Sequence, residues 1–289
     1  MTYAALTTTD GQRLHVQHWP APDTAAARGT VLIVHGLGEH IGRYAHVAAH
    51  LNAAGWHVTG YDHRGHGRSD GPKGKITSDD DLLRDLGQMI DHVRQHTPGP
   101  LVLLGHSMGG LIASRFVGQG VARPGEAPGD WHRPVDALVL SSPALAADTN
   151  AIQKLLLATL GALAPDLAVN NGLKPEWISR DPKVVAAYNA DPLVHDRITP
   201  RLARFILGNG EWVRHHAARW KVPTLLLYAG SDRCVAPSGS RDFAATAPKS
   251  VVTTREFGPL YHEIFNEPEQ AEVLAVLSSW LQSLKGSGA

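Results

Sequence analysis

The sequence has little cysteine and no excess of either charge. Among its 289 residues the one cysteine, Cys234, has no partner for an internal disulfide. Lysine and arginine together number 27, as do aspartate and glutamate, and no basic block offers the phosphate-neutralising surface that nucleic-acid binding requires. We therefore expect a fold without a disulfide framework and without a nucleic-acid partner. No obligate protein partner is evident either.

Long apolar runs are also missing from the chain. The most apolar segment, around residues 155–163, is shorter than the roughly 20 residues that a membrane-spanning helix needs. The N-terminal residues MTYAALTTTDGQRL lack the basic and then apolar layout of a secretory signal. The sequence therefore predicts a cytoplasmic protein that does not cross a membrane.

The chain does contain short runs rich in leucine and β-branched residues, and these alternate with longer helical patterns. The alternation is typical of βαβ units and predicts an α/β fold, with a mostly parallel central sheet flanked by helices. Buried strands are predicted over 30–34, 57–61, 101–104, 135–140, 224–228 and 251–255. Helices are predicted over 43–54, 79–95, 108–117, 239–247 and 268–284. Residues 3–8 and 13–17 predict a hairpin at the edge of the sheet.

One long segment interrupts this alternation. Between residues 146 and 217 helical patterns continue without a convincing strand. The segment lacks the Gly/Ser linkers of a separate domain, so we expect a helical cap that is inserted into the core and folds on it. The predicted organisation is a first part of the core over 1–145, the helical cap over 146–217 and a second part of the core over 218–289.

The sequence Gly105-His106-Ser107-Met108-Gly109 lies where a predicted buried strand gives way to a helix. In this context the pattern G-x-S-x-G forms a nucleophile elbow, a sharp turn that lifts the serine Oγ above the sheet. The two outer glycines leave room for neighbouring backbone, and the start of the helix directs its N–H groups toward developing negative charge. Ser107 is therefore the predicted nucleophile.

A serine nucleophile needs a base near neutral pH, and the base needs an orienting acid. In this arrangement the acid and then the histidine follow the serine along the chain. Asp232 ends the apolar segment TLLLYAGSD, which places its carboxylate at the carboxyl edge of the sheet, where sites of α/β proteins form. Of 17 histidines, His262 is the one that follows Asp232. The order predicts a catalytic triad of Ser107, Asp232 and His262.

The oxyanion of such a reaction needs two N–H donors, one from the residue after the nucleophile and one from the loop after an earlier strand. Met108 supplies the first. We assign the second to Leu37 in His35-Gly36-Leu37-Gly38, where glycines let the backbone approach a ligand closely. Because the nucleophile, the base and the oxyanion donors are all present, we expect neither a metal nor an organic cofactor.

Residues 35–72, HGLGEHIGRYAHVAAHLNAAGWHVTGYDHRGHGRSDGP, together with the later GHSMGG, resemble the monoacylglycerol lipase and lysophospholipase group of α/β-hydrolases. Ser141-Ser142-Pro143 and Gly230-Ser231-Asp232 are similar too. The resemblance covers nearly the whole chain and departs mainly in the cap and at residues 123–134. It implies the α/β-hydrolase fold, the same triad and oxyanion positions, and hydrolysis of a carboxylic ester through an acyl-enzyme.

Apolar side chains recur at helical spacing in the predicted cap, within residues 151–164. The stripe consists of Ile152, Leu155, Leu156, Leu160 and Leu163. Packing on the core is the first interpretation, because helices normally bury such a face against their own domain. Leu156 and Leu160 could instead hold an acyl chain above Ser107. The substrate would then be a single-chain lipid ester, such as a monoacylglycerol or a lysophospholipid, and the cap could contact lipid surfaces transiently.

Three other interpretations stay open. A small-ester esterase would use the same triad. So would an aminopeptidase or an acyltransferase, because one fold hosts several reactions. An aminopeptidase would need acidic cap residues to bind a free amine, and the candidates are Asp166, Glu176 and Asp181. The non-enzymatic alternative is a catalytically silent α/β-hydrolase that binds a ligand.

Overall fold

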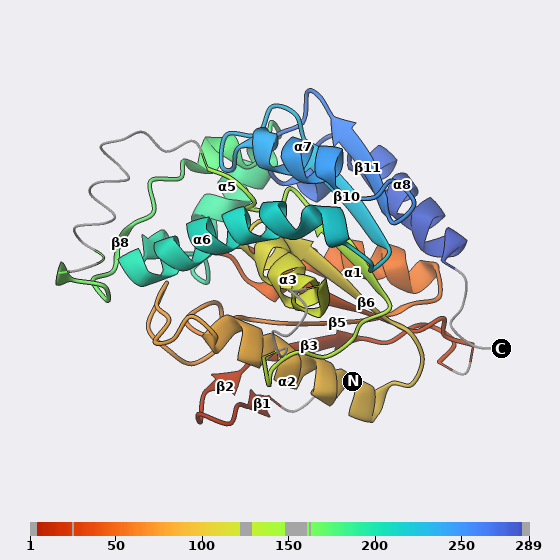
Figure 1. Cartoon of the computed structure of the whole chain (residues 1–289), viewed down its shortest axis with the longest axis horizontal. Coiled ribbons are helices and arrows are strands. Elements are labelled where there is room, and N and C mark those ends of the chain that lie inside the picture. The colour runs from red at the N-terminus through yellow and green to blue at the C-terminus, as the bar shows by residue number, and fades with distance from the viewer. Residues whose placement is uncertain (1–4, 25, 122–128, 148–160, 162, 285–289) are drawn as a thin grey trace.

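The computed structural model describes residues 5–24, 26–121, 129–147, 161 and 163–284. At its centre lies a sheet in the order β11-β10-β7-β6-β4-β5-β3 (Figure 1). Its strands are β3 (Val16–Trp19), β4 (Thr30–Val34), β5 (His57–Tyr61), β6 (Leu101–His106), β7 (Ala137–Ser141), β10 (Thr224–Ala229) and β11 (Val252–Phe257). Neighbouring strands are parallel except β3, which pairs antiparallel with β5. The predicted α/β fold with a mostly parallel sheet is confirmed.

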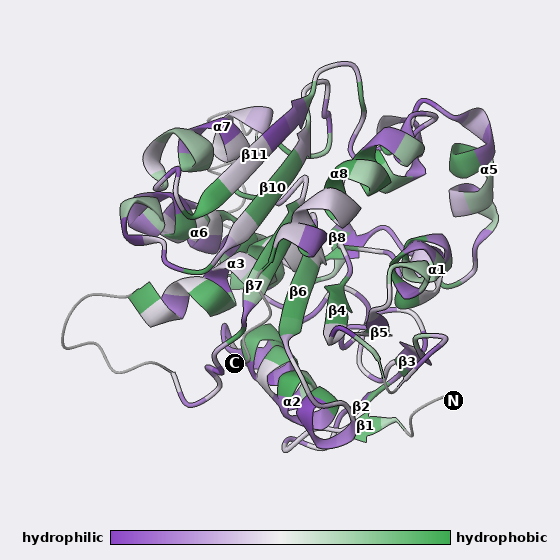
Figure 2. Cartoon of the chain, turned by 90° about the vertical axis from the view of Figure 1, so that its right-hand side faces the viewer, coloured by the Kyte–Doolittle hydropathy of each residue, from purple (hydrophilic) through white to green (hydrophobic). Residues whose placement is uncertain are grey.

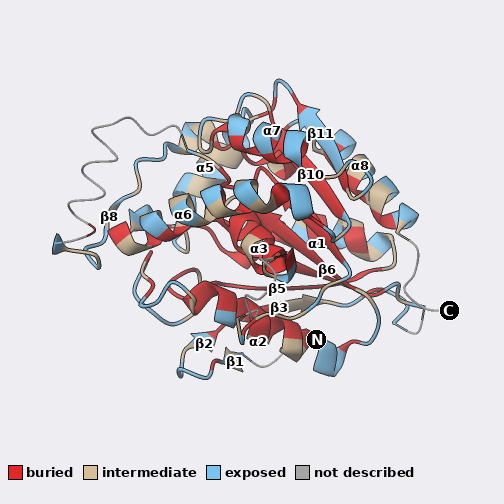
Figure 3. Ribbon diagram, viewed as in Figure 1, coloured by how far each residue is buried: buried red, intermediate tan, exposed pale blue. Residues whose placement is uncertain are grey.

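Helices cover both faces of this sheet because its central strands are apolar on both sides. In β4, Val31 and Ile33 join one core cluster, while Leu32 and Val34 point to the opposite face and join the other. The first cluster includes residues of α1 (Ala45–Ala53) and α8 (Gln270–Ser283). The second includes residues of α2 (Asp81–His96), α3 (Met108–Gly118), α6 (Pro200–His216) and α7 (Pro237–Thr246). The central strands form an apolar layer (Figure 2) that is buried between the helices (Figure 3).

Two predictions near the edges of the sheet need correction. The N-terminal hairpin forms, since β1 (Leu6–Thr7) pairs antiparallel with β2 (Arg13–Leu14), but it is a small separate sheet, and β3 is the edge strand. The prediction that residues 251–255 form a buried strand is wrong in its burial, because Thr253 to Glu256 of β11 are exposed. β11 lies at the other edge and has a neighbouring strand on one side only.

The segment between β7 and β10 adds no strand to the main sheet in the part that the structure describes. It contains η3 (Pro175–Trp177), α5 (Pro182–Ala190) and α6, with a ladder of β8 (Val169–Asn170) and β9 (Arg197–Ile198). Strands of two residues are too short for an alternating pattern, so the sequence did not predict this ladder. The division at residues 146 and 217 stays a prediction.

Backbone hydrogen bonds tie this segment to two loops of the core. The N–H of His195 donates to the Gly38 carbonyl at 2.8 Å, and that of Thr199 donates to the Gly74 carbonyl at 2.9 Å. Within the described ranges, no helix is long and apolar enough to cross a membrane. The cytoplasmic location stays a prediction.

Candidate active site

Ser107 lies on the turn between β6 and α3, with a backbone φ of 53° and ψ of −121°. This left-handed φ is strained for a residue with a Cβ. Neighbouring backbone packs closely against the turn, which favours glycine at its two outer positions. A Cβ at Gly105 would lie 2.5 Å from the Gly109 carbonyl oxygen. A Cβ at Gly109 would lie 2.0 Å from the Val34 carbonyl oxygen. The turn therefore has the geometry that the sequence predicts for a nucleophile elbow.

A second match to G-x-S-x-G spans residues 67–71 and has a different structure. Ser69 lies in a loop rather than between a strand and a helix, and its hydroxyl donates to the Asp62 carbonyl at 2.6 Å. The pattern alone therefore does not identify the candidate nucleophile. The strand, turn and helix around Ser107 do.

The structure brings Ser107, Asp232 and His262 together from three separate segments. Asp232 follows β10, and His262 lies in the loop after β11. His262 Nδ1 donates to Asp232 Oδ2 at 2.7 Å, and the Ser107 hydroxyl donates to His262 Nε2 at 2.8 Å. Asp232 Oδ1 accepts the N–H groups of Cys234 and Val235 at 2.8 and 3.0 Å. Both carboxylate oxygens of Asp232 therefore accept hydrogen bonds. Since His262 donates through Nδ1, its Nε2 can accept the hydroxyl proton of Ser107.

Charges around His262 favour its protonated form. Burial by itself would lower the pKa of His262, but Asp232, followed by Glu263 and Glu39, raises this pKa above 6.5 overall. The ring centroids of His106 and His262 are 4.7 Å apart. Burial and the nearby His262 lower the pKa of His106 to about 4, so the His106 ring is neutral near pH 7. The site can therefore stabilise a positive charge on His262 as it accepts a proton.

Two backbone N–H groups are available beside Ser107. Met108 begins α3, and the first N–H groups of a helix have no acceptor within it. For Leu37, the preceding Gly36 carbonyl accepts a hydrogen bond from His35 Nδ1 at 2.8 Å. Because this peptide is trans, its N–H points away from the carbonyl that His35 holds. Gly36 adjoins the serine, since a Cβ there would lie 3.1 Å from the Ser107 Cβ, so His35 fixes the direction of a candidate oxyanion donor.

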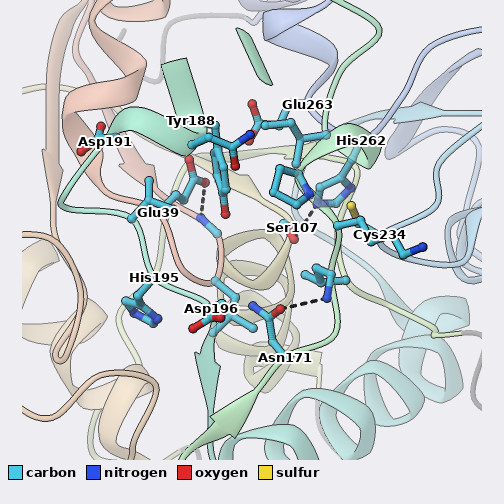
Figure 4. Close-up of a pocket in the computed structure, with 18 of the residues that line it drawn as sticks. Glu39, Ser107, Asn171, Tyr188, Asp191, His195, Asp196, Cys234, His262 and Glu263 are labelled. Carbon is cyan, nitrogen blue, oxygen red and sulfur yellow. Dashed lines mark hydrogen bonds between the residues drawn. The ribbon is translucent and has the colours of Figure 1, made fainter. Parts of the chain in front are cut away.

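Two cavities of different character meet at Ser107. The polar cavity has a volume of about 390 Å³, and Glu39, Asn171, Tyr188 and His262 are among the side chains that line it (Figure 4). The apolar cavity has a volume of about 270 Å³. Its lining includes Met108, Leu145, Ile206, Leu207 and Val235, together with the charged Glu211 and Arg214. Leu37, Leu173 and Cys234 border both cavities.

The predicted acyl-chain contacts Leu156 and Leu160 lie outside the described residues. Leu163 of the same stripe is described, and its side chain is 81 % exposed. At Leu163, therefore, the stripe does not pack on the core.

None of the three acidic cap residues proposed for amine binding lines the polar cavity. Asp166 pairs with Lys75 and Arg201, and the Asp181 side chain caps the N-terminus of α5. Glu176 is exposed in η3. Two other acidic residues of the segment between β7 and β10, Asp191 and Asp196, do line this cavity.

Sequence analysis missed Tyr188 and Glu263 in this site. Glu263 had a local signal, since it adjoins His262, and its carboxylate accepts two hydrogen bonds from Arg43. Tyr188 had none, because it belongs to α5 and reaches the site only through the folding of the segment between β7 and β10. Its ring lies 4.8 Å from the Arg43 guanidinium carbon.

The Cys234 thiol lies near the candidate triad. Ligand atoms of Asp232, Cys234 and His262 lie within 4.8 Å of one another, so they could in principle hold a metal ion. Burial, together with Asp232 and Glu263, raises the pKa of the Cys234 thiol well above its usual range, which disfavours the thiolate that metals bind. The expectation of a site without a metal stays a prediction.

A mostly parallel sheet with a serine on a strained turn at the carboxyl end of its central strand defines a class of protein. The chain is a serine hydrolase of the α/β-hydrolase fold. Residues 25–269 match the profile of the family described as serine aminopeptidase, S33, and the chain belongs to this family.

Relatives narrow the group further. The chain is 39 % identical over 285 residues to a monoacylglycerol lipase of Mycolicibacterium smegmatis, and the alignment covers 94 % of each chain. It is 31 % identical to the phospholipase YtpA of Bacillus subtilis, with 84 % of this chain and 91 % of that protein covered. The crystal structure of a monoacylglycerol lipase from Paleococcus ferrophilus is similar at a TM-score of 0.80, with 35 % identity and coverage of 94 % and 99 %. The resemblance seen in the sequence is confirmed, and the chain is a carboxylic ester hydrolase.

Proposed function

We propose that Ser107 is the nucleophile of this esterase, that His262 is its general base and that Asp232 orients the base. The observation that carries this proposal is the continuous pair of hydrogen bonds from Ser107 to His262 and from His262 to Asp232. The N–H groups of Leu37 and Met108 serve as oxyanion donors.

The reaction proceeds in two halves. His262 Nε2 takes the Ser107 proton as Oγ attacks the ester carbonyl carbon, and the imidazolium then gives that proton to the leaving alkoxide oxygen. The alcohol departs and an acyl-enzyme remains. His262 next deprotonates a water molecule that attacks the acyl carbonyl, after which Ser107 regains a proton and the carboxylic acid is released. Asp232 stabilises the imidazolium in both halves.

The two cavities receive different ends of the substrate. The leaving alcohol must lie near His262 Nε2, from which it takes its proton. His262 lines the polar cavity and is absent from the lining of the apolar one. We therefore assign the alcohol to the polar cavity and the acyl chain to the apolar cavity, where burial of methylene groups favours binding.

A single-chain lipid ester matches this division, and a monoacylglycerol is our proposed substrate. Its glycerol hydroxyls suit the polar lining, which includes Asn171 and Tyr188. Its one acyl chain suits the apolar cavity. The relative in Mycolicibacterium smegmatis, which is named a monoacylglycerol lipase, supports the same substrate.

Two measurements test this function. A fluorophosphonate probe should add its mass to Ser107 in the wild type and leave Ser107→Ala unlabelled. The value of kcat/KM should rise from acetyl to medium-chain p-nitrophenyl esters and should be high for monoacylglycerols. Strong preference for acetate with no hydrolysis of monoacylglycerols would leave a small-ester esterase, and absence of labelling would favour the silent ligand-binding alternative.

The aminopeptidase alternative meets a charge problem in the polar cavity. A free ammonium group would need an available carboxylate, but Glu39 and Glu263 already bind Arg43. Asp191 accepts a hydrogen bond from His40 Nε2 at 2.8 Å. Asp196 accepts one from the Asn170 amide at 2.6 Å and pairs with Arg197 at 3.2 Å. We therefore expect amino-acid p-nitroanilides to be hydrolysed far more slowly than the matching p-nitrophenyl esters. Equal rates would support the aminopeptidase.

We also propose that residues 146–217 act as a cap that contacts lipid surfaces. Leu163 and Leu167 support this, because their side chains are 81 % and 54 % exposed. The double variant Leu163→Asp/Leu167→Asp should co-sediment less with phosphatidylcholine vesicles than the wild type. Ala186→Asp, at an exposed position on α5 in the same segment, is the matched control and should co-sediment as the wild type does. Equal sedimentation of all three proteins would contradict the contact.

A further inference from the structure

A buried charge cluster adjoins the candidate oxyanion loop, and none of its members transfers a proton or forms a bond in the proposed mechanism. Its members are Glu39, Arg43, Tyr44 and Glu263, and we call it the Arg43 cluster. The side chains of Glu39, Arg43 and Glu263 are 5 %, 11 % and 6 % exposed. Burying charges is costly unless each is paired and hydrogen-bonded, so the position of this cluster needs an explanation.

The first connection of the cluster is to the oxyanion loop. Glu39 Oε1 accepts the Gly36 N–H at 2.6 Å and the Tyr44 hydroxyl at 2.7 Å, while Oε2 accepts from Arg43 at 2.8 Å. His35 holds the carbonyl of the same Gly36. Both polar groups of this glycine are therefore fixed by side chains, and the direction of the Leu37 N–H follows from them.

The second connection is to the loop that carries His262. Arg43 donates to both carboxylate oxygens of Glu263, at 2.6 and 2.7 Å. The Asn266 amide also donates to Glu263, at 2.8 Å. Such bidentate pairs fix direction as well as distance. One guanidinium thus links segments that are 220 residues apart in the sequence.

We propose that Glu39, Arg43 and Glu263 are positioning residues, which hold the Leu37 N–H and His262 in one fixed arrangement. The inference rests on the function proposed above. Loss of one carboxylate would leave Arg43 partly unpaired in a buried place and would release one of the two loops. A displacement of about 1 Å between reacting groups can cost about 100-fold in rate. Glu39 and Glu263 line the polar cavity, but their hydrogen bonds run to Gly36 and Arg43, so the cluster acts on the reaction through Gly36 and His262.

The cluster also leaves one negative charge in surplus beside His262. The cluster contains two carboxylates and a single guanidinium. Burial would raise the pKa of Glu39, but Arg43 lowers it overall and so keeps Glu39 ionised. Glu39, Glu263 and Asp232 all favour the imidazolium. Other groups that adjoin His262 are the neutral His106 and the Cys234 thiol, whose raised pKa keeps it protonated. Removal of the Glu263 charge should therefore lower the pKa of His262.

The test uses Glu39→Gln and Glu263→Gln with p-nitrophenyl butyrate, whose turnover does not depend on a glycerol head group. We expect kcat to fall about 10- to 100-fold with little change in KM. Rates are divided by the concentration of sites that a fluorophosphonate labels, so unfolded protein does not count. In Glu263→Gln the acid limb of the kcat/KM profile should also move to lower pH, since neutral His262 is the active form. Arg43→Lys should retain more activity than Arg43→Met.

A second buried ion pair supplies a matched control. Arg64 donates to both carboxylate oxygens of the fully buried Asp85, at 2.6 and 2.7 Å, and neither residue lines the two cavities at Ser107. Asp85→Asn should lower the midpoint temperature of unfolding and leave kcat per labelled site unchanged. The acid limb of its kcat/KM profile should lie at the same pH as in the wild type.

Two outcomes would overturn the inference. One is a kcat per labelled site within twofold of wild type in both glutamine variants. The other is an equal loss of kcat in Asp85→Asn, which would reveal a general effect of stability. Neither outcome would contradict the proposal that Ser107 is the nucleophile. That proposal would be wrong if Ser107→Ala remained active or were still labelled.

Discussion

The polar and apolar cavities meet at the same serine, but they are made from different parts of the chain. The polar cavity takes Glu39 from a loop after β4, Tyr188 from α5 and His262 from the loop after β11. The apolar cavity takes Ile206 and Leu207 from α6, together with residues 144–147. Charged and titratable groups are thus concentrated on one side of Ser107, and methylene-rich surface on the other. The difference supports our proposal that the two cavities receive the two ends of an amphipathic ester.

We expect the largest effect from substitutions of the side chains where the two cavities meet. Ser107→Ala or His262→Ala should lower kcat by a factor on the order of 10⁶, and Asp232→Asn by about 10⁴. Esters with short and with long acyl chains should lose activity equally, because both depend on the same bond-breaking step at Ser107. Stopped assays with p-nitrophenyl acetate and octanoate measure the loss, and circular dichroism checks the fold. Activity that survived Ser107→Ala would place the nucleophile elsewhere.

A substitution confined to the apolar cavity should separate the two acyl lengths. Leu207 is partly exposed on α6, so Leu207→Trp should fill the cavity without disturbing the core. We expect kcat/KM for the octanoate ester to fall about 10- to 200-fold, the scale on which apolar sites discriminate by size. The acetate ester should react at nearly the wild-type rate. If both esters lost activity in the same proportion, the acyl chain would not occupy this cavity.

The reciprocal substitution lies in the polar cavity. Asn189 is exposed on α5, and Asn189→Trp should narrow the space assigned to the alcohol. We expect kcat/KM for a monoacylglycerol to fall about tenfold relative to the methyl ester of the same acid. The preference for acyl length should stay as in the wild type. A shift in acyl preference instead would mean that the assignment of the two cavities is reversed.

The smallest predicted effect concerns the stability of the polar side. His106 is buried, with a pKa of about 4 against 6.5 for the free side chain, so the folded state binds fewer protons than the unfolded state between these values. The free energy of unfolding should therefore fall as pH falls from 6.5 toward 4, by up to about 1.4 kcal/mol per pH unit for each such histidine. His106→Gln should make this decline shallower by that amount.

Urea unfolding of the wild type and His106→Gln at pH 7, 6 and 5 measures this slope. His35, His63 and His66 also have pKa values well below 6.5 because they are buried, so a decline should remain in the variant. Identical slopes in the two proteins would contradict the assignment of a neutral His106.

The candidate triad could be predicted from the sequence alone because each of its signals is local. The elbow is a strand, a turn and a helix within residues 101–118, and the structure forms them as β6, Ser107 and α3. Asp232 closely follows the apolar strand β10, and a single histidine comes after it in the sequence. Burial was predicted less well where it depends on position in the sheet, as β11 shows. An edge strand and an interior strand can have similar composition.

The sequence by itself determined the α/β alternation, the elbow at Ser107 and the order of the acid and the histidine, since backbone preferences and apolar periodicity act over a few residues. Only the tertiary structure decided the division into two cavities and the pairing of Arg43 with Glu263. These depend on packing between segments up to 220 residues apart. A charged side chain in a sequence carries no mark of whether it will be buried. The physical reason is that desolvation and ion pairing arise only when the folded chain excludes water from around both partners.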